Sequence, residues 1–152
     1  RMFSGKKVAW NASKQIVTDK QNFMTKGCSV CLELPGGNRI LRQKLNKNVL
    51  KTGQRYQLSF YLKLEKVIDP ANPRGGFFMD IRFGKSGADN VLFPLSPALS
   101  GTLPWTRYQF EFTAPANIGT KGSPYIGFYL APGARGKVWI DHVEIIPLIT
   151  GK

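Results

Sequence analysis

Acidic residues, histidine and cysteine are all scarce in this sequence of 152 residues. Nine Asp or Glu face 22 Lys or Arg, which gives a formal net charge of +13, and there are one histidine and two cysteines. A zinc site built from Cys-x-x-Cys pairs needs a second pair, which the sequence does not contain. Its apolar runs are also far shorter than the roughly 20 residues of a transmembrane helix. These deficits exclude zinc-ribbon and helical membrane-spanning classes.

The two cysteines, Cys28 and Cys31, form a single Cys-x-x-Cys pair. They lie in a run, residues 28–34, whose pattern predicts a β-strand. Residues three apart on a strand point to opposite faces, and their Cα atoms are about 10 Å apart, too far for a disulfide. We therefore expect two buried thiols.

Aromatic residues, glycine and proline are well represented. Aromatics make up 12% of the chain, with 16 Gly and 10 Pro, a mixture that favours strands and turns over a helix bundle. The hydrophobic content of 42% is too high for a disordered segment. We expect one domain spanning residues 1–152, because the length suits one hydrophobic core.

Apolar and polar residues alternate with a period of two along most of the chain, and no convincing helical period is present. The clearest segment is 56–65, in which Tyr56, Leu58 and Phe60 alternate with polar neighbours. Only a short helical turn near 94–100 is expected. The pattern predicts an all-β antiparallel β-sandwich of about nine short strands. The expected strands are 6–10, 14–18, 28–34, 39–45, 56–65, 77–83, 107–113, 125–130 and 138–145.

Positive charge is concentrated in the first half of the chain. Residues 1–66 hold 14 Lys or Arg and three Asp or Glu, and the stretch 39–55 holds six bases and no acid. This asymmetry indicates an acidic polysaccharide, a nucleic acid or a membrane surface as partner, or else a solvated basic face. No signal peptide is visible and the chain opens at Arg1, which favours a mature fragment or an excised module.

Three segments resemble carbohydrate-binding modules of the family 4, 9, 16 and 22 group. They are Gly53-x-x-Tyr56-x-Leu58-Ser59-Phe60, then Trp105-x-x-Tyr108-x-Phe110-x-Phe112, then Gly136-x-Val138-Trp139-Ile140-Asp141. The three segments occur in the same order, and at nearly the same spacing, as in the modules of that group. The resemblance implies a galactose-binding-like jelly-roll β-sandwich and non-catalytic glycan binding, as an accessory module of a secreted glycan-degrading enzyme.

The resemblance also implies a structural calcium ion. In this group an acidic residue near the start and the Asp of the last strand commonly hold the ion, and Asp141 matches the latter. Ser4 stands where the acidic residue is usual, and the loss of a carboxylate weakens a calcium site. The alternative for Asp141 is a carboxylate that hydrogen-bonds the backbone.

Glycan recognition combines flat aromatic faces with planar polar side chains. The outward positions, which alternate with the core positions along each strand, carry both kinds of side chain. The resemblance places these strands in one curved sheet. Trp139 is either a platform on the second face or a covered residue. The expected ligand-binding residues are Gln57, Tyr61, Lys63, Phe78, Asp80, Arg82, Arg107, Gln109, Glu111 and Tyr129.

We therefore expect a non-catalytic polysaccharide-binding module, with a preference for acidic or sulfated chains over neutral β-glycans. Asp80 and Glu111 would share the candidate face, but neighbouring arginines would keep both ionised, which argues against a glycosidase pair. The alternatives are a structural sandwich domain between enzyme modules and a basic jelly-roll nucleic-acid-binding protein. The latter is disfavoured because the bases of 39–55 lie away from the aromatic strands.

Overall fold

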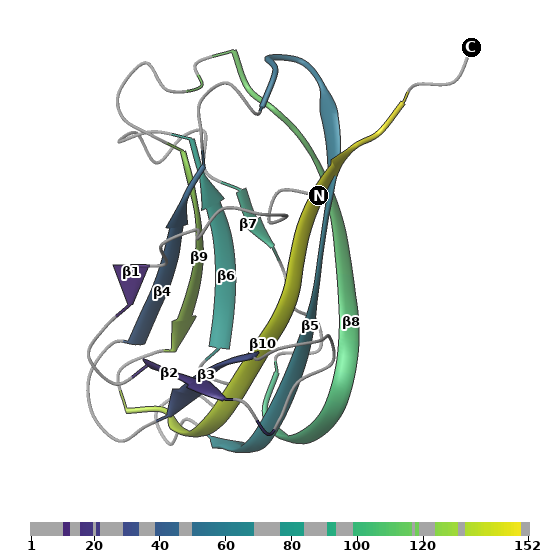
Figure 1. Ribbon diagram of the computed structural model, residues 1–152. Coiled ribbons are helices and arrows are strands. Elements are labelled where there is room, and N and C mark those ends of the chain that lie inside the picture. Colours follow the sequence, from purple (N-terminus) through teal and green to yellow (C-terminus); the bar gives the residue numbers. More distant parts are fainter. Residues whose placement is uncertain are drawn as a thin grey trace.

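In the computed structural model every regular element that is described is a β-strand (Figure 1). The described residues are 11–12, 16–19, 21, 29–33, 39–45, 50–68, 77–83, 91–93, 99–116, 118, 124–130 and 133–149. The strands are β1 (Asn11–Ala12), β2 (Ile16–Asp19), β3 (Ser29–Glu33), β4 (Arg39–Lys44), β5 (Arg55–Ile68), β6 (Phe77–Arg82), β7 (Val91–Phe93), β8 (Gly101–Thr113), β9 (Tyr125–Leu130) and β10 (Arg135–Pro147).

These strands form two five-stranded sheets, and all the pairings are antiparallel. Sheet A has the order β1-β4-β9-β6-β7, and sheet B has the order β2-β3-β10-β5-β8. In Figure 1 the strands of sheet A lie on the left and the long strands β10, β5 and β8 lie on the right. The predicted antiparallel β-sandwich is thus confirmed.

Aromatic side chains from both sheets meet in the core. Phe60 of β5 is fully buried and packs edge-on against Phe128 of β9, with ring centroids 5.3 Å apart. Phe83, which follows β6, packs in a tilted arrangement against Phe112 of β8, with ring centroids 5.9 Å apart. The alternating apolar residues of β5, β6, β8 and β9 thus face the opposite sheet, and the residues between them face outward.

Three strands are longer than the short segments that the pattern predicts. β5 has 14 residues, and β8 and β10 have 13 each. β5 continues past its predicted end through a bulge at Lys66, whose φ is +49° and whose N–H donates to Thr102 Oγ1 at 3.1 Å. A second bulge interrupts β10 at His142, also at φ +49°. Each bulge adds one residue to its strand and shifts the side-chain alternation there.

Gly136 of β10 lies directly against the bulge in β5. Its φ is +110°, and a Cβ atom at this position would lie 2.5 Å from the carbonyl oxygen of Lys66. Only glycine can adopt this backbone conformation and permit this approach without strain. Gly136 is therefore a requirement of the register between β10 and β5.

Several segments differ from the sequence expectations. β1 and β7 are short strands that the pattern did not indicate, and β8 begins six residues before the predicted strand 107–113. The expected strand 6–10 lies outside the described residues, as does most of the expected turn at 94–100. Within the described residues, no helix is long and apolar enough to cross a membrane.

Candidate functional site

The ten expected ligand-binding residues do not share one sheet. Six of them, on β5 and β8, belong to sheet B: Gln57, Tyr61, Lys63, Arg107, Gln109 and Glu111. The other four, on β6 and β9, belong to sheet A: Phe78, Asp80, Arg82 and Tyr129. The expectation of a single face was wrong because alternation tells which residues avoid the core but not which sheet a strand joins. The protein has two outer faces instead.

On the outer face of sheet A, Tyr125 is flanked by arginines from both neighbouring strands. The guanidinium of Arg42 on β4 lies 5.1 Å from the ring centroid of Tyr125, and that of Arg82 on β6 lies 5.8 Å from it. Lys44, which is exposed, is the residue directly opposite Tyr125 on β4. We call Arg42, Lys44, Asp80, Arg82 and Tyr125 the sheet A face.

Asp80 is the acidic member of the sheet A face. Its side chain is 6% exposed, and its Oδ2 accepts a hydrogen bond from Arg82 Nε at 2.7 Å. The other oxygen, Oδ1, is buried and accepts no hydrogen bond from the described part of the chain. The residue opposite Asp80 on β9 is Gly127, which has no side chain, and Arg42 lies opposite Gly127 on the other side. The pairing of Asp80 with Arg82 fixes the direction of both side chains.

Phe78 and Tyr129 are cross-strand partners on β6 and β9. Their side chains lie outside the described part of the structure, so their predicted contact with ligand stays a prediction.

On the outer face of sheet B, Tyr61 occupies the middle of β5 between Asp141 of β10 and Arg107 of β8. The ring of His142 packs edge-on to that of Tyr61, with centroids 6.4 Å apart, and His142 Nε2 lies 3.1 Å from Glu144 Oε2. Next along the strand, the small Ser59 lies between longer residues, Glu144 on one side and Gln109 on the other. We call Gln57, Tyr61, Arg107, Gln109, His142 and Glu144 the sheet B face.

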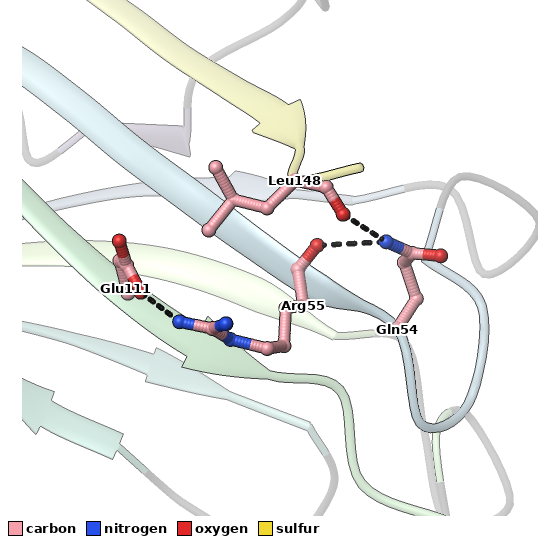
Figure 2. Close-up of polar contacts among 4 residues, drawn as sticks. All are labelled: Gln54, Arg55, Glu111 and Leu148. Atoms are coloured by element: carbon pink, nitrogen blue, oxygen red, sulfur yellow. Dashed lines mark hydrogen bonds and ion pairs between the residues drawn. The ribbon is translucent and has the colours of Figure 1, made fainter. Parts of the chain in front are cut away.

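At the edge of the sheet B face, Arg55 of β5 forms an ion pair with Glu111 of β8 (Figure 2). Both side chains are about half exposed, at 53% and 49%. The adjoining Gln54 donates its Nε2–H groups to the carbonyl oxygens of Arg55, at 3.0 Å, and Leu148, at 2.9 Å. These bonds join the start of β5 to the segment that follows β10, and Glu111 serves in an exposed ion pair there.

Lys63 and Trp139 are cross-strand partners on sheet B. Trp139 is only 4% exposed, and the ammonium of Lys63 lies 5.0 Å from the centroid of its ring. Trp139 is therefore a covered residue rather than an open platform. Its partner on the other side, Cys31, is also buried, as expected, whereas Cys28 lies outside the described residues.

Asp141 is buried at the bulge of β10, and its Oδ1 accepts the backbone N–H of His142 at 2.6 Å. This contact corresponds to the alternative of a carboxylate bonded to the backbone. Among the residues that the structure describes, no group of three or more His, Cys, Asp or Glu could hold a metal ion. Calcium also takes backbone carbonyl and water oxygens as ligands, and Ser4 lies outside the described residues. The calcium ion at Asp141 stays a prediction.

Sequence reasoning missed Tyr125, Arg42, Lys44, His142 and Glu144. Tyr125 has the same parity along β9 as Tyr129, which was selected, so strict alternation could have found it. Arg42 and Lys44 were noted only as part of the basic stretch 39–55, which was expected to lie away from the aromatic strands. That expectation was wrong, because β4 pairs with β9 and brings both bases beside Tyr125. His142 reaches the outer face through the bulge, and the alternation pattern gives no signal of a bulge.

The fold is shared with solved carbohydrate-binding modules. The module named Family 16 Carbohydrate Binding Module-2 matches with a TM-score of 0.62 at 17% identity, over 87% of this chain and 85% of that one. The CBM22-1 xylan-binding domain of Xyn10C from Paenibacillus barcinonensis matches with a TM-score of 0.61 at 14% identity, over 97% and 91%. Modules of families 4 and 61 also match. The β-sandwich implied by the three sequence motifs is therefore confirmed.

The same fold occurs inside a larger protein. The enzymatically active domain of tailspike protein 4 from bacteriophage CBA120 matches with a TM-score of 0.63 at 16% identity, over 93% of this chain but only 19% of that one. A scan against protein-family models and a search of curated proteins found no match for this chain.

Proposed function

We propose that this chain is a non-catalytic polysaccharide-binding module whose sheet A face binds an acidic glycan. The observation that carries this proposal is the placement of Tyr125 between Arg42 and Arg82. An aromatic ring with planar, hydrogen-bonding cations on both sides is the combination that a uronic-acid or sulfated sugar requires. The shared fold with carbohydrate-binding modules supports the same class of ligand.

Charge favours an acidic chain over a neutral one. Three bases, Arg42, Lys44 and Arg82, surround Tyr125, and Asp80 is the one acid among the described residues of this face. Arginine binds carboxylate and sulfate groups through two parallel hydrogen bonds, whereas a neutral sugar has no negative charge for these bases to bind. The guanidinium and ammonium groups can also donate hydrogen bonds to sugar hydroxyls. The face therefore has groups for both the acidic and the hydroxyl parts of an acidic sugar.

A catalytic role has little support. Glycoside hydrolysis ordinarily uses two carboxylates about 5–10 Å apart across one bond. Asp80 and Glu111, the pair that the sequence suggested, lie on different sheets, and each is paired with an arginine. We extend the proposal to an accessory module of a secreted glycan-degrading enzyme, as the xylan-binding domain that matches is a part of a longer protein.

The experiment is affinity electrophoresis in gels containing polygalacturonate, alginate, heparin or DNA, at 50 and 500 mM NaCl. We expect one acidic glycan to retard the protein. Each of Tyr125→Ala and Arg42→Gln should weaken binding about tenfold, the effect of losing one contact worth about 1.4 kcal/mol. Arg107→Gln, which removes the same charge from sheet B, is the matched control and should change affinity less than twofold. The thermal midpoint of each variant shows that it is folded.

Two results would contradict the proposal. If DNA and every acidic glycan retard the protein alike and Arg107→Gln weakens binding as much as Arg42→Gln, the charge is generic and the nucleic-acid alternative gains support. If none of the acidic glycans retards the folded protein at either salt concentration, the sheet A face does not bind an acidic glycan and the proposal is wrong.

A further inference from the structure

The sheet B face is a second place where an aromatic ring and planar polar groups meet. Tyr61 lies at its centre and is half-buried, with the ring of His142 packed edge-on to its own. Arg107 and Gln109 on one side are exposed, as is His142 on the other. The cross-strand register places all of them within two residues of Tyr61 along their strands.

The imidazole of His142 is held in place by contacts within the face. His142 packs edge-on to Tyr61, and its Nε2 lies 3.1 Å from Glu144 Oε2. The backbone bulge at His142, with the N–H bonded to Asp141, sets the direction of that imidazole ring. A ligand lying on Tyr61 would therefore meet an imidazole whose position is fixed before it binds, which lowers the entropic cost of that contact.

The charge of this region is balanced, in contrast to the sheet A face. Along residues 55–65 of β5 and the positions of β8 and β10 opposite them, the outward bases and acids are equal in number: Arg55, Lys63, Arg107 and Lys137 against Glu65, Glu111, Asp141 and Glu144. Arg55 is neutralised by Glu111, and the ammonium of Lys63 lies on Trp139. Such a surface gives no net attraction to a polyanion, but its amides, imidazole and guanidinium can bond sugar hydroxyls.

We infer that the sheet B face is a second binding site, for a neutral polysaccharide chain stacked on Tyr61. The side chains of Gln109, Arg107 and His142 bond the hydroxyls of the sugars along it. The two outer faces of a sandwich point in opposite directions, and the core between the sheets is about 10 Å thick. One sugar chain thus occupies one face, and the protein holds an acidic and a neutral chain together.

The test is calorimetric titration of the whole chain with neutral oligosaccharides: xylohexaose, cellohexaose, mannohexaose and β-1,4-galactohexaose. We expect one of them to bind, with an affinity that changes less than twofold between 50 and 500 mM NaCl. Tyr61→Ala and Gln109→Ala should each weaken it about tenfold, since stacking and a buried hydrogen bond each contribute about 1–1.5 kcal/mol. Thr113→Ala, an exposed change on the same strand, is the matched control and should leave it unchanged.

Two measurements separate this site from the one proposed on sheet A. Tyr125→Ala should leave the neutral hexaose bound, and a saturating acidic oligosaccharide should not compete with it. The inference is overturned if no neutral hexaose binds, if the two ligands compete, or if Tyr125→Ala abolishes neutral binding while folded Tyr61→Ala and Gln109→Ala do not weaken it. The acidic site on sheet A is unaffected by a failure here, because its ligand and its variants are different.

Discussion

The two outer faces of this sandwich use similar side chains with different charge balance. On the sheet A face, three bases and one acid surround Tyr125, whereas around Tyr61 on sheet B the outward bases and acids are equal in number. The strands of both sheets alternate in the same way, so the fold does not cause this difference. It arises from which strands carry the basic stretch 39–55: β4 brings Arg42 and Lys44 to sheet A, while Arg55 enters sheet B and meets Glu111.

The ion pairs of the two faces also differ in burial. Asp80 is 6% exposed and relies on Arg82, whereas Arg55 and Glu111 are both about half exposed. An exposed pair is screened by water and contributes little, but a buried carboxylate that loses its partner is strongly unfavourable. The pair on sheet A is thus part of the structure, and the pair on sheet B is a surface feature.

Replacing the arginine of each pair in turn should give the largest difference in stability between the two faces. Arg82→Ala leaves the carboxylate of Asp80 buried without its ion-pair partner and should lower the free energy of unfolding by about 3 kcal/mol. Arg55→Ala, at the exposed pair, should lower it by less than about 0.5 kcal/mol. Urea denaturation of the two variants and the parent chain measures both values.

A second variant tests the cause of that loss. Adding Asp80→Asn to Arg82→Ala removes the uncompensated charge and should recover a large part of the lost stability. The interpretation fails if Arg82→Ala and Arg55→Ala destabilise alike, or if the double variant is no more stable than Arg82→Ala.

The position of the sheet B face depends on the fit of Gly136 against the bulge at Lys66. In Gly136→Ala the new Cβ would lie 2.5 Å from a backbone oxygen at a φ of +110°, and we expect a loss of about 2 kcal/mol or more. Gly133→Ala is the matched control, because Gly133 also has a positive φ, +86°, but nothing lies within 4 Å of its Cβ position. The free energy of unfolding of Gly133→Ala should fall by about 1 kcal/mol.

Thermal and urea denaturation of the two alanine variants isolates the effect of the close approach. Any folded Gly136→Ala protein should also bind the neutral hexaose less tightly while keeping its affinity for the acidic glycan. Equal stability of the two variants would show that strain in φ, and not contact with β5, is what requires glycine.

The sequence was sufficient to predict the fold class because alternation repeats over many residues. Tyr56, Leu58 and Phe60 all face the core as expected, and the motif ending in Asp141 lies on the last strand. It did not predict the lengths of β5, β8 and β10, because a bulge such as that at Lys66 leaves no periodic signal. The strands continue through these irregularities since their backbone pairing resumes with a shifted register.

The candidate site was predicted only in part, for a topological reason. The alternation of apolar and polar residues correctly placed Tyr61 and Arg82 away from the core. However, β5 and β6 join different sheets, and alternation carries no information on sheet order. Arg42 was overlooked because its role depends on Tyr125 of β9, more than 80 positions further along the chain. The pairing of β4 with β9 is a long-range contact that no local pattern reveals.

The smallest expected effect is a loss of stability at alkaline pH, caused by Tyr108 on the inner surface of sheet B. Tyr108 of β8 stacks on Phe60 with centroids 5.9 Å apart, and its burial raises its pKa above the ordinary value of 10.0. Below pH 10 the residue is protonated in both the folded and the unfolded chain. As the pH rises further, the unfolded chain ionises first, so the free energy of unfolding falls until the pH passes the folded pKa. The loss should be smaller than either effect above.

Tyr108→Phe has no hydroxyl to ionise, so it should lose less stability than the parent chain between pH 9 and pH 11. Urea denaturation at both pH values gives the difference. If Tyr108→Phe loses as much stability as the parent chain over this range, ionisation of the buried Tyr108 hydroxyl is not a cause of the alkaline loss.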